Sequence, residues 1–186
     1  MKGYIYTTSV DPGKGVFLND PIFDKIPTLG ACMPNIRRNV QKGDYIFTVS
    51  GKTTSVNQYI IGGFEVESKI HALAALDEFP ENVLRRAEDG TKRGNIIVLA
   101  DGSRNPIDDH SNFEKRLDNY IIGKNPIHIA NPEQVALARI ETLGLLKSIF
   151  AKDGERVVDI IGRSSKMEER QVLGILEWLE SIKKAS

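Results

Sequence analysis

The segment 43–67 constrains the fold of this chain most strongly. It opens on a glycine–aspartate turn, and an alternating run of aromatic and β-branched residues follows at 45–50. A polar connection leads to a second such run at 58–67, so the segment predicts a β-hairpin. Gly62 and Gly63 lie inside the second run. Paired glycines in a strand indicate a bulge or a sharp bend, which small closed barrels require.

Further strands are predicted on both sides of this hairpin. Residues 4–10 alternate in the same way and end at an Asp-Pro-Gly turn signal. The short apolar run at 95–100 predicts another strand, and 119–123 predicts a weaker one. We expect strands 4–10, 44–50, 58–67 and 95–100 to form one curved, mainly antiparallel sheet or barrel.

Helices are predicted mainly in the C-terminal part of the chain. Asn131 and Pro132 suit the cap and the first position of a helix that runs to about Phe150. A short helix is expected at 157–161. A capping-box pattern at 165–168 predicts a last helix, whose apolar stripe comprises Val172, Leu176, Leu179 and Ile182.

Two earlier helices are also expected. One begins near Pro34, because proline suits the first turn of a helix. The other covers roughly 72–87, with a break or restart at Pro80.

The charge balance argues against broad binding to a polyanion. The chain has 25 Lys and Arg residues and 25 Asp and Glu residues, so its net charge is zero. Non-specific affinity for nucleic acid comes mainly from neutralising phosphates. A local basic patch remains compatible with this balance.

Cysteine usage and hydropathy predict where the protein resides. Cys32 is the single cysteine, so no intramolecular disulfide forms and a reducing compartment is expected. The N-terminus lacks the apolar stretch of a signal peptide. No run approaches the roughly 18 apolar residues of a membrane span. We therefore expect a cytoplasmic protein without a membrane partner.

Neither a metal nor a cofactor is predicted. The chain has three histidines, and none pairs with cysteine or another histidine at ligand spacing. The run 108–110, Asp-Asp-His, offers metal ligands, but a solvated acidic turn is favoured. The glycine-rich run 11–15 lacks the spacing of a phosphate-binding loop. A catalytic role for Cys32 is not favoured either, because a lone cysteine is more often a small buried hydrophobe.

The most suggestive binding segment is Cys32–Asp44. Pro34 would begin a helix and place Arg37 and Arg38 about one turn in. Paired arginines offer bidentate donors for a phosphate or a base edge. Lys42 and Lys52 join them if the tip of the hairpin folds nearby. The alternative is a solvent-exposed basic helix face.

That block resembles the nucleotide-modification-associated domains, and is most similar to the second type of that numbered set. In this family a Cys-x-Pro-x-Ile-Arg-like block precedes Gly-Asp and a strand, as Cys32–Asp44 does here. The segments 59–67, 110–111 and 119–123 are similar to later pieces of the family, so the resemblance covers roughly 3–130. The hairpin also resembles PUA-like domains of the EVE, ASCH and YTH group.

The resemblance implies a fold and a context. In PUA-like domains a small β-barrel binds a nucleobase or a modified base. We expect an α+β protein with a small PUA-like, mainly antiparallel β-barrel, flanking helices and a helical C-terminus. The first domain would be the PUA-like domain, 1–130. A helical extension, 131–186, would pack on that domain or on a partner. The context would be nucleotide modification or phage–host defence.

The first functional hypothesis is therefore binding of a nucleotide or a modified base in nucleic acid, without catalysis. A base that leaves a duplex needs a pocket and aromatic stacking. The ligand-binding candidates are the residues of the block, of the neighbouring strands and of the hairpin: Arg37, Arg38, Tyr6, Thr8, Cys32, Pro34, Tyr45, Ser50 and Lys52.

Two alternatives remain open. The chain could be an enzyme that acts on nucleotides or nucleic acid, with His110 as acid/base and Asp101, Asp108 or Asp109 as its helpers. It could also be an interaction protein that forms a homodimer through its C-terminal helices.

Overall fold

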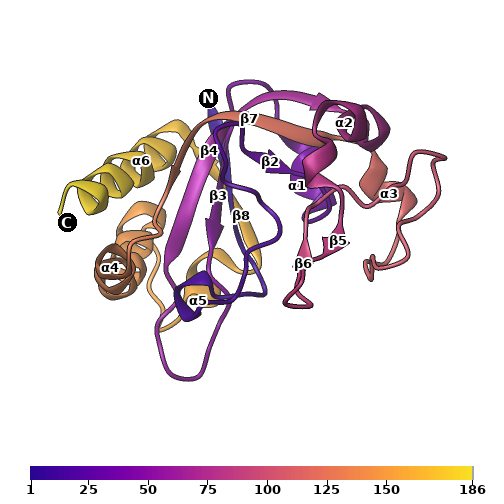
Figure 1. The fold of residues 1–186 in the computed structure, drawn as a ribbon. Helices are drawn as coiled ribbons and strands as arrows, with labels where there is room; N and C mark the ends of the chain where they lie inside the picture. The colour runs from indigo at the N-terminus through magenta and orange to yellow at the C-terminus, as the bar shows by residue number, and fades with distance from the viewer. Residues whose placement is uncertain (186) are drawn as a thin grey trace. The chain divides into compact units, whose positions relative to one another are not determined.

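In the computed structural model, which describes residues 1–185, the chain forms two compact units. Unit 1 consists of Met1–Phe17, Gly43–Glu65 and the chain from Pro126 onward, and unit 2 consists of Leu18–Lys42 and Val66–Asn125. Each unit is therefore built from segments that are far apart in the sequence, as the colours of Figure 1 show.

The chain is an α+β protein with a mixed six-stranded sheet of order β2-β7-β4-β3-β1-β8. Its strands are β1 (Lys2–Thr7), β2 (Thr28–Leu29), β3 (Tyr45–Val49), β4 (Ile60–Ile70), β7 (Tyr120–His128) and β8 (Ser164–Glu168). β1 runs parallel to β3, whereas the pairs β3–β4, β1–β8 and β2–β7 are antiparallel. The α+β prediction is confirmed.

The sheet is open, with β2 and β8 at its edges, so the predicted closure into a barrel is wrong. The expected strand at 95–100 does not join the sheet and forms only isolated bridges to Val83 and Arg104. Its apolar side chains instead fill the core of unit 2, where Ile96 and Val98 pack with Tyr120. A buried apolar run has the same pattern whether or not its backbone pairs in a sheet.

The β3–β4 hairpin forms as predicted, including the irregularity at its glycines. The register shifts between Thr48 and Val49, opposite Gly62, which marks a bulge. A Cβ atom on Gly63 would lie 2.3 Å from a ring carbon of Phe47. A Cβ atom on Gly62 would lie 2.3 Å from the carbonyl oxygen of Ile127 in β7. Both positions are therefore glycine because a neighbouring strand, β3 or β7, approaches too closely for a side chain.

Three helices of unit 1 lie in its C-terminal part: α4 (Pro132–Phe150), α5 (Val157–Ile161) and α6 (Glu169–Lys184). The first two match their predictions, and Asn131 caps α4 by accepting from the backbone N–H of Glu133 at 2.8 Å. The helix predicted from Ser165 begins only at Glu169, because the segment 164–168 pairs with β1 as a strand.

Helix α6 packs on β1, β8 and α4. Val172, Leu179 and Ile182 of its apolar stripe are fully buried, and Leu176 is half-buried. The stripe therefore serves the core of unit 1. Among residues 1–185, no helix is both long and apolar enough to cross a membrane.

The smaller elements lie mostly in unit 2. They are α1 (Pro34–Asn39), α2 (Ala72–Glu78), the 3₁₀ turn η2 (Pro80–Asn82), the two-stranded ribbon β5 (Arg85–Arg86) and β6 (Lys92–Arg93), and α3 (Glu114–Leu117); the turn η1 (Pro12–Lys14) belongs to unit 1. The helix expected from Pro34 is confirmed. The helix expected over 72–87 ends at Glu78, and its last residues form β5 instead.

Candidate functional site

Unit 1 contains a pocket of about 720 Å³. Thr7, the last residue of β1, lines it together with the loop 52–58, which follows β3. Because β1 and β3 are parallel and Thr7 pairs with Val49, the loops after both strands leave the same edge of the sheet. Open sheets commonly bind ligands beyond the carboxyl ends of parallel strands.

The opposite wall comes from the C-terminal helices. Leu143 of α4 and the segments 155–158 and 162–163 around α5 complete the lining. The pocket therefore joins the two parallel strand ends to a helical segment more than 100 positions later in the chain. Only folding brings these parts together.

The lining combines cationic, hydrogen-bonding and apolar groups. Its cations are Lys52, Arg156 and Arg163, its hydroxyl and amide groups are Thr7, Thr53, Thr54, Ser55, Asn57 and Gln58, and its apolar side chains are Val56, Leu143, Val157 and Val158. Glu155 is the one acidic lining residue among those described. Such a wall suits a ligand that combines an anionic group with an apolar part.

The cations of the pocket differ in their partners. Arg156 forms an ion pair of 2.7 Å with Asp159, which raises the pKa of the guanidinium. Within residues 1–185, neither Lys52 nor Arg163 forms an ion pair, and both are exposed. These two side chains therefore have their charge available for a ligand.

The loop that carries Lys52 is anchored at both of its ends. Ser50 Oγ accepts from the backbone N–H of Tyr59 at 3.0 Å, and Gln58 Nε2 donates to the carbonyl of Ser50 at 2.7 Å. The backbone N–H of Gly51 donates to the carbonyl of Val10 at 2.7 Å. The loop after β3 is thus joined to the loop after β1.

Arg139 of α4 holds both loops against the helical wall. Its Nη2 donates to the two carboxylate oxygens of Asp11 at 2.8 and 2.9 Å, and its Nη1 donates to the carbonyl of Asn57. The guanidinium carbon lies 4.8 Å from the centre of the Tyr59 ring. Both partners of the Arg139–Asp11 pair are largely buried, so the pair fixes the edge of the pocket rather than filling it.

The sequence-predicted residues of unit 1 take different places. Lys52 lines the pocket, as does Thr7, the neighbour of the predicted Thr8. Ser50 is fully buried and holds the base of the hairpin. Tyr6 lies in the core, and Tyr45 is half-buried and stacks with Phe47, with their ring centres 6.0 Å apart.

The sequence analysis missed the arginines of the helical wall. Arg156 directly precedes the correctly predicted helix at 157–161, and Arg163 follows it after Gly162. That flanking pattern was a usable signal of a basic cluster. Nothing local in the sequence, however, indicated that the hairpin loop faces it.

In unit 2, Arg37 is wholly buried and is bound to the backbone. Its Nε donates to the carbonyl of Cys32 at 2.9 Å, and its Nη atoms donate to the carbonyls of Arg116, Asp118 and Asn119 at 3.2, 2.9 and 3.1 Å. Burial lowers the pKa of the guanidinium to about 10. This geometry favours a role in joining two backbone segments rather than contact with a ligand.

Pro34 and Arg38, the other predicted residues of the helix that begins in this block, also lie in unit 2. Pro34 begins α1 and is half-buried. Arg38 is exposed and donates to the side-chain oxygen of Asn35 at 3.2 Å. Within the described chain, neither residue lines the pocket of unit 1.

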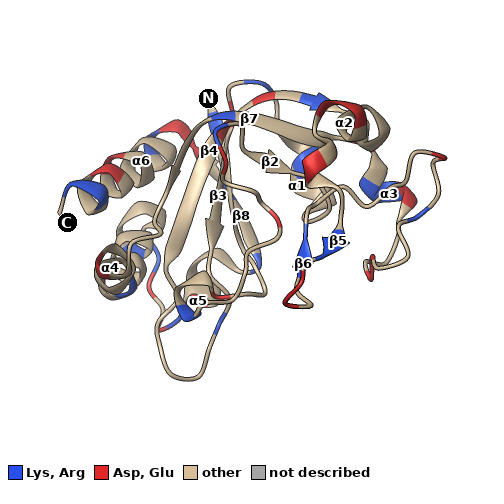
Figure 2. Ribbon diagram, viewed as in Figure 1, with Lys and Arg blue, Asp and Glu red and all other residues tan. Residues whose placement is uncertain are grey.

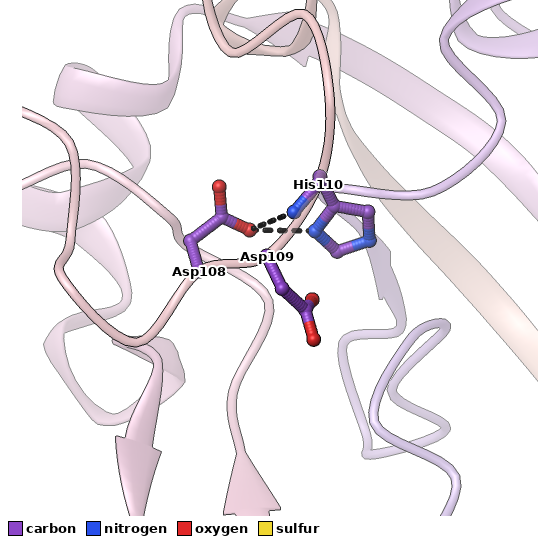
Figure 3. Close-up of side chains that lie close together, drawn as sticks. All are labelled: Asp108, Asp109 and His110. Carbon is purple, nitrogen blue, oxygen red and sulfur yellow. Dashed lines mark hydrogen bonds and ion pairs between the residues drawn. The ribbon is translucent and has the colours of Figure 1, made fainter.

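His110 belongs to a hydrogen-bonded cluster, and Figure 3 shows its contact with Asp108 beside the neighbouring Asp109. Its Nδ1 lies 2.6 Å from Oδ1 of Asp108, and its Nε2 lies 3.8 Å from Sγ of Cys32. Asp108 is buried, and its Oδ2 accepts from Nε of Arg104 at 2.9 Å. The structure thus brings together two of the predicted site residues, Cys32 and His110, which are 78 positions apart.

The remaining carboxylates considered as helpers lie outside this cluster's hydrogen bonds. Asp109 pairs with Lys92 at 2.6 Å, and Asp101 accepts from its neighbour Ser103. Ligand atoms of Asp108, Asp109 and His110 do lie within 4.8 Å of one another. Because both oxygens of Asp108 already accept hydrogen bonds, the arrangement favours a protein-bonded cluster over a cation site.

No protein-family model, curated protein or solved structure matches this chain. The similarity to nucleotide-modification-associated and PUA-like domains therefore remains a prediction from the Cys32–Asp44 block and the hairpin.

Proposed function

We propose that unit 1 binds a nucleotide, or a nucleobase with its phosphate presented from a nucleic acid, in the pocket beyond β1 and β3. The observation that carries this proposal is a single cavity with exposed cations, several hydroxyl and amide groups and apolar side chains. Its volume of about 720 Å³ lies within the range of about 300–1,000 Å³ typical of small-molecule sites.

Each class of lining group has a role in this proposal. Lys52 and Arg163 neutralise the phosphate, and the guanidinium of Arg163 offers a bidentate fork where Lys52 offers a point charge. Val56, Leu143 and Val157 cover the faces of the base. The side-chain amides of Asn57 and Gln58 pair with its edge, as both can donate and accept.

The charge distribution favours local contact with one or two phosphates. In Figure 2 basic and acidic residues are interspersed along the ribbon, in keeping with the net charge of zero. A protein that neutralises many phosphates of a duplex needs a larger excess of Lys and Arg. A free nucleotide or a single extruded or unpaired base therefore suits the pocket better than a long duplex.

The PUA-like relation is part of this proposal. It concerns strands β1, β3 and β4, because the resemblance lies in the β3–β4 hairpin. The open sheet of this chain would place the base at the strand ends, without an enclosing barrel.

Titration calorimetry with mononucleotides and short single-stranded oligonucleotides tests the proposal. Lys52→Ala and Arg163→Ala should each weaken binding about tenfold or more, because a charge-assisted hydrogen bond contributes roughly 1.5–3 kcal/mol. The matched control is Lys166→Ala, an exposed cation of the same unit that does not line the pocket. The proposal fails if no nucleotide binds, or if the two pocket variants bind like the control.

A further inference from the structure

The cluster of Cys32, His110, Asp108 and Arg104 has no part in the pocket described above. All four residues belong to unit 2. His110 and Asp108 come from one polar loop, whereas Cys32 lies two residues before the start of α1. The contact between the thiol and the imidazole therefore depends on the tertiary fold rather than on sequence proximity.

The hydrogen bonds fix the tautomer of His110. An ionised carboxylate only accepts, so the 2.6 Å contact with Oδ1 of Asp108 requires a proton on Nδ1. In the neutral ring Nε2 is then the acceptor, and it is this atom that lies 3.8 Å from Sγ of Cys32. A base oriented by a carboxylate and directed at a nucleophile is the arrangement of a catalytic triad.

Asp108 is held firmly behind the imidazole. Its side chain is fully buried, and Arg104 binds both its Oδ2 and its backbone carbonyl, at 2.9 and 3.0 Å. The side chain of His110 itself is 29% exposed. The imidazole is therefore accessible from solvent while its orientation is set from the interior.

The backbone around Cys32 is also fixed. Its N–H donates to Oδ2 of Asp20 at 2.6 Å, and its carbonyl accepts from Nε of Arg37 at 2.9 Å. The next residue, Met33, has a φ of 50°, a left-handed conformation that a side chain such as methionine seldom adopts. Such conformations occur where a turn must present a neighbouring group, and they cluster at functional sites.

We propose that Cys32, His110 and Asp108 form a nucleophilic site for acyl transfer, acting on the carbonyl carbon of an ester, thioester or amide. Cys32 and His110 would be the catalytic residues, and Asp108 a positioning residue that acts through His110. This inference does not rest on the nucleotide pocket of unit 1, and each can fail without the other.

The reaction balances without an added oxidant or metal. Sγ attacks the carbonyl carbon while Nε2 of His110 takes the thiol proton. The tetrahedral intermediate then expels the alcohol, thiol or amine, which receives that proton, and a thioester remains on Cys32. Water attacks the thioester with His110 again as base, and the products are a carboxylic acid and the free thiol.

The state of the thiol sets the role of the histidine. Burial, with the nearby carboxylate of Asp20, raises the pKa of Cys32 to about 12. The resting group is therefore a neutral thiol at physiological pH, and proton transfer to His110 must accompany the attack. Reactivity should then depend on His110 strongly, as it does for a catalytic serine.

The test uses p-nitrophenyl acetate as the acyl donor, with mass spectrometry of the intact chain and of its peptides. Since Cys32 is the single cysteine, any thioester-linked acetyl group that the peptide masses locate reports on this site. We expect a burst of one p-nitrophenolate per chain and an acetyl group on Cys32. His110→Ala should slow the burst about 100-fold or more, and added imidazole should restore part of the rate.

Two further variants separate catalysis from folding. Asp108→Asn should lower the burst rate constant and leave its dependence on ester concentration unchanged, because the carboxylate orients the base without touching the ester. Asp109→Asn, the exposed neighbour, should react like the wild type. An absent Cys32 adduct in the wild type, or an equal burst rate in folded His110→Ala, would overturn the inference, as would a loss that imidazole does not rescue in any degree.

Discussion

Replacing Arg37 with alanine should destabilise the protein strongly, and the structure permits an estimate of the effect. The substitution leaves the carbonyls of Cys32, Arg116, Asp118 and Asn119 without their donor. A buried polar group left unsatisfied costs about 1–3 kcal/mol. Because several carbonyls are affected and a large side chain is removed from the interior, we expect a loss of about 3 kcal/mol or more in the free energy of unfolding.

The assay is thermal and urea unfolding followed by circular dichroism. A loss of about 3 kcal/mol corresponds to a fall of about 6–12 °C in Tm for a chain of this size. The urea midpoint should fall while the slope m stays the same. Arg38→Ala is the matched control, because the Arg38 side chain is exposed and, among residues 1–185, is hydrogen-bonded to Asn35 alone; it should change stability by about 0.5 kcal/mol or less.

The comparison between the two adjacent arginines decides the role of Arg37. If Arg37→Ala proves no more destabilising than Arg38→Ala, the assignment of Arg37 to the backbone of unit 2 is refuted. If Arg37→Ala retains wild-type stability and loses nucleotide affinity, the residue contacts the ligand, as the sequence analysis predicted.

Three further predictions follow from single contacts. Asp20→Asn should lower Tm by several degrees, because the carboxylate of Asp20 accepts from three consecutive backbone N–H groups at 30–32. An unchanged Tm in differential scanning calorimetry would show that these bonds contribute nothing to stability. Lys124 and Lys42 lower the pKa of Glu67 from 4.5 to about 2. Ionised Glu67 therefore stabilises the fold above pH 4.5, and this contribution is lost as the pH falls towards 2. A midpoint near pH 4.5 for Glu67 in a carbon-detected NMR titration would contradict this prediction. Gly63→Ala should cost about 1–3 kcal/mol in urea unfolding, because its Cβ would lie 2.7 Å from a backbone oxygen of β3, and unchanged stability would show that the strands separate easily.

The elements predicted correctly carry their signals locally. The hairpin of β3 and β4, its glycine bulge and the caps of α4 all depend on residues within a few positions of one another. The last helix shows the limit of this approach. Its predicted start at Ser165 was wrong because pairing with β1, a partner some 160 positions earlier, outweighs the local capping pattern.

The sheet topology could not be predicted from the sequence either, because it too depends on pairing between distant segments. The alternation of polar and apolar residues does not specify which strand pairs with which. It therefore predicts neither the parallel pairing of β1 with β3 nor the open edges at β2 and β8. The apolar run at 95–100 illustrates the ambiguity, since its side chains are buried as expected while its backbone stays outside the sheet.

The candidate sites were predictable only in part. Lys52 was correctly placed at the hairpin tip, but its proximity to Arg156 and Arg163 arises from the packing of α5 and its flanking residues. Cys32 and His110 were each considered alone, and their 3.8 Å contact appears only in the folded chain. Arg37 shows the converse, because an arginine that looks like a phosphate ligand in sequence is fully buried.

Nucleotide titration followed by amide NMR shifts tests the central claim most directly. With ¹⁵N-labelled protein and a mononucleotide, the largest shift changes should map to Thr7, the loop 52–58 and the segments 155–158 and 162–163, which line the pocket. The amides of 30–38 in unit 2 should remain unchanged. Shift changes concentrated at 30–38, or absent throughout at millimolar nucleotide, would contradict the assignment of the binding site to unit 1.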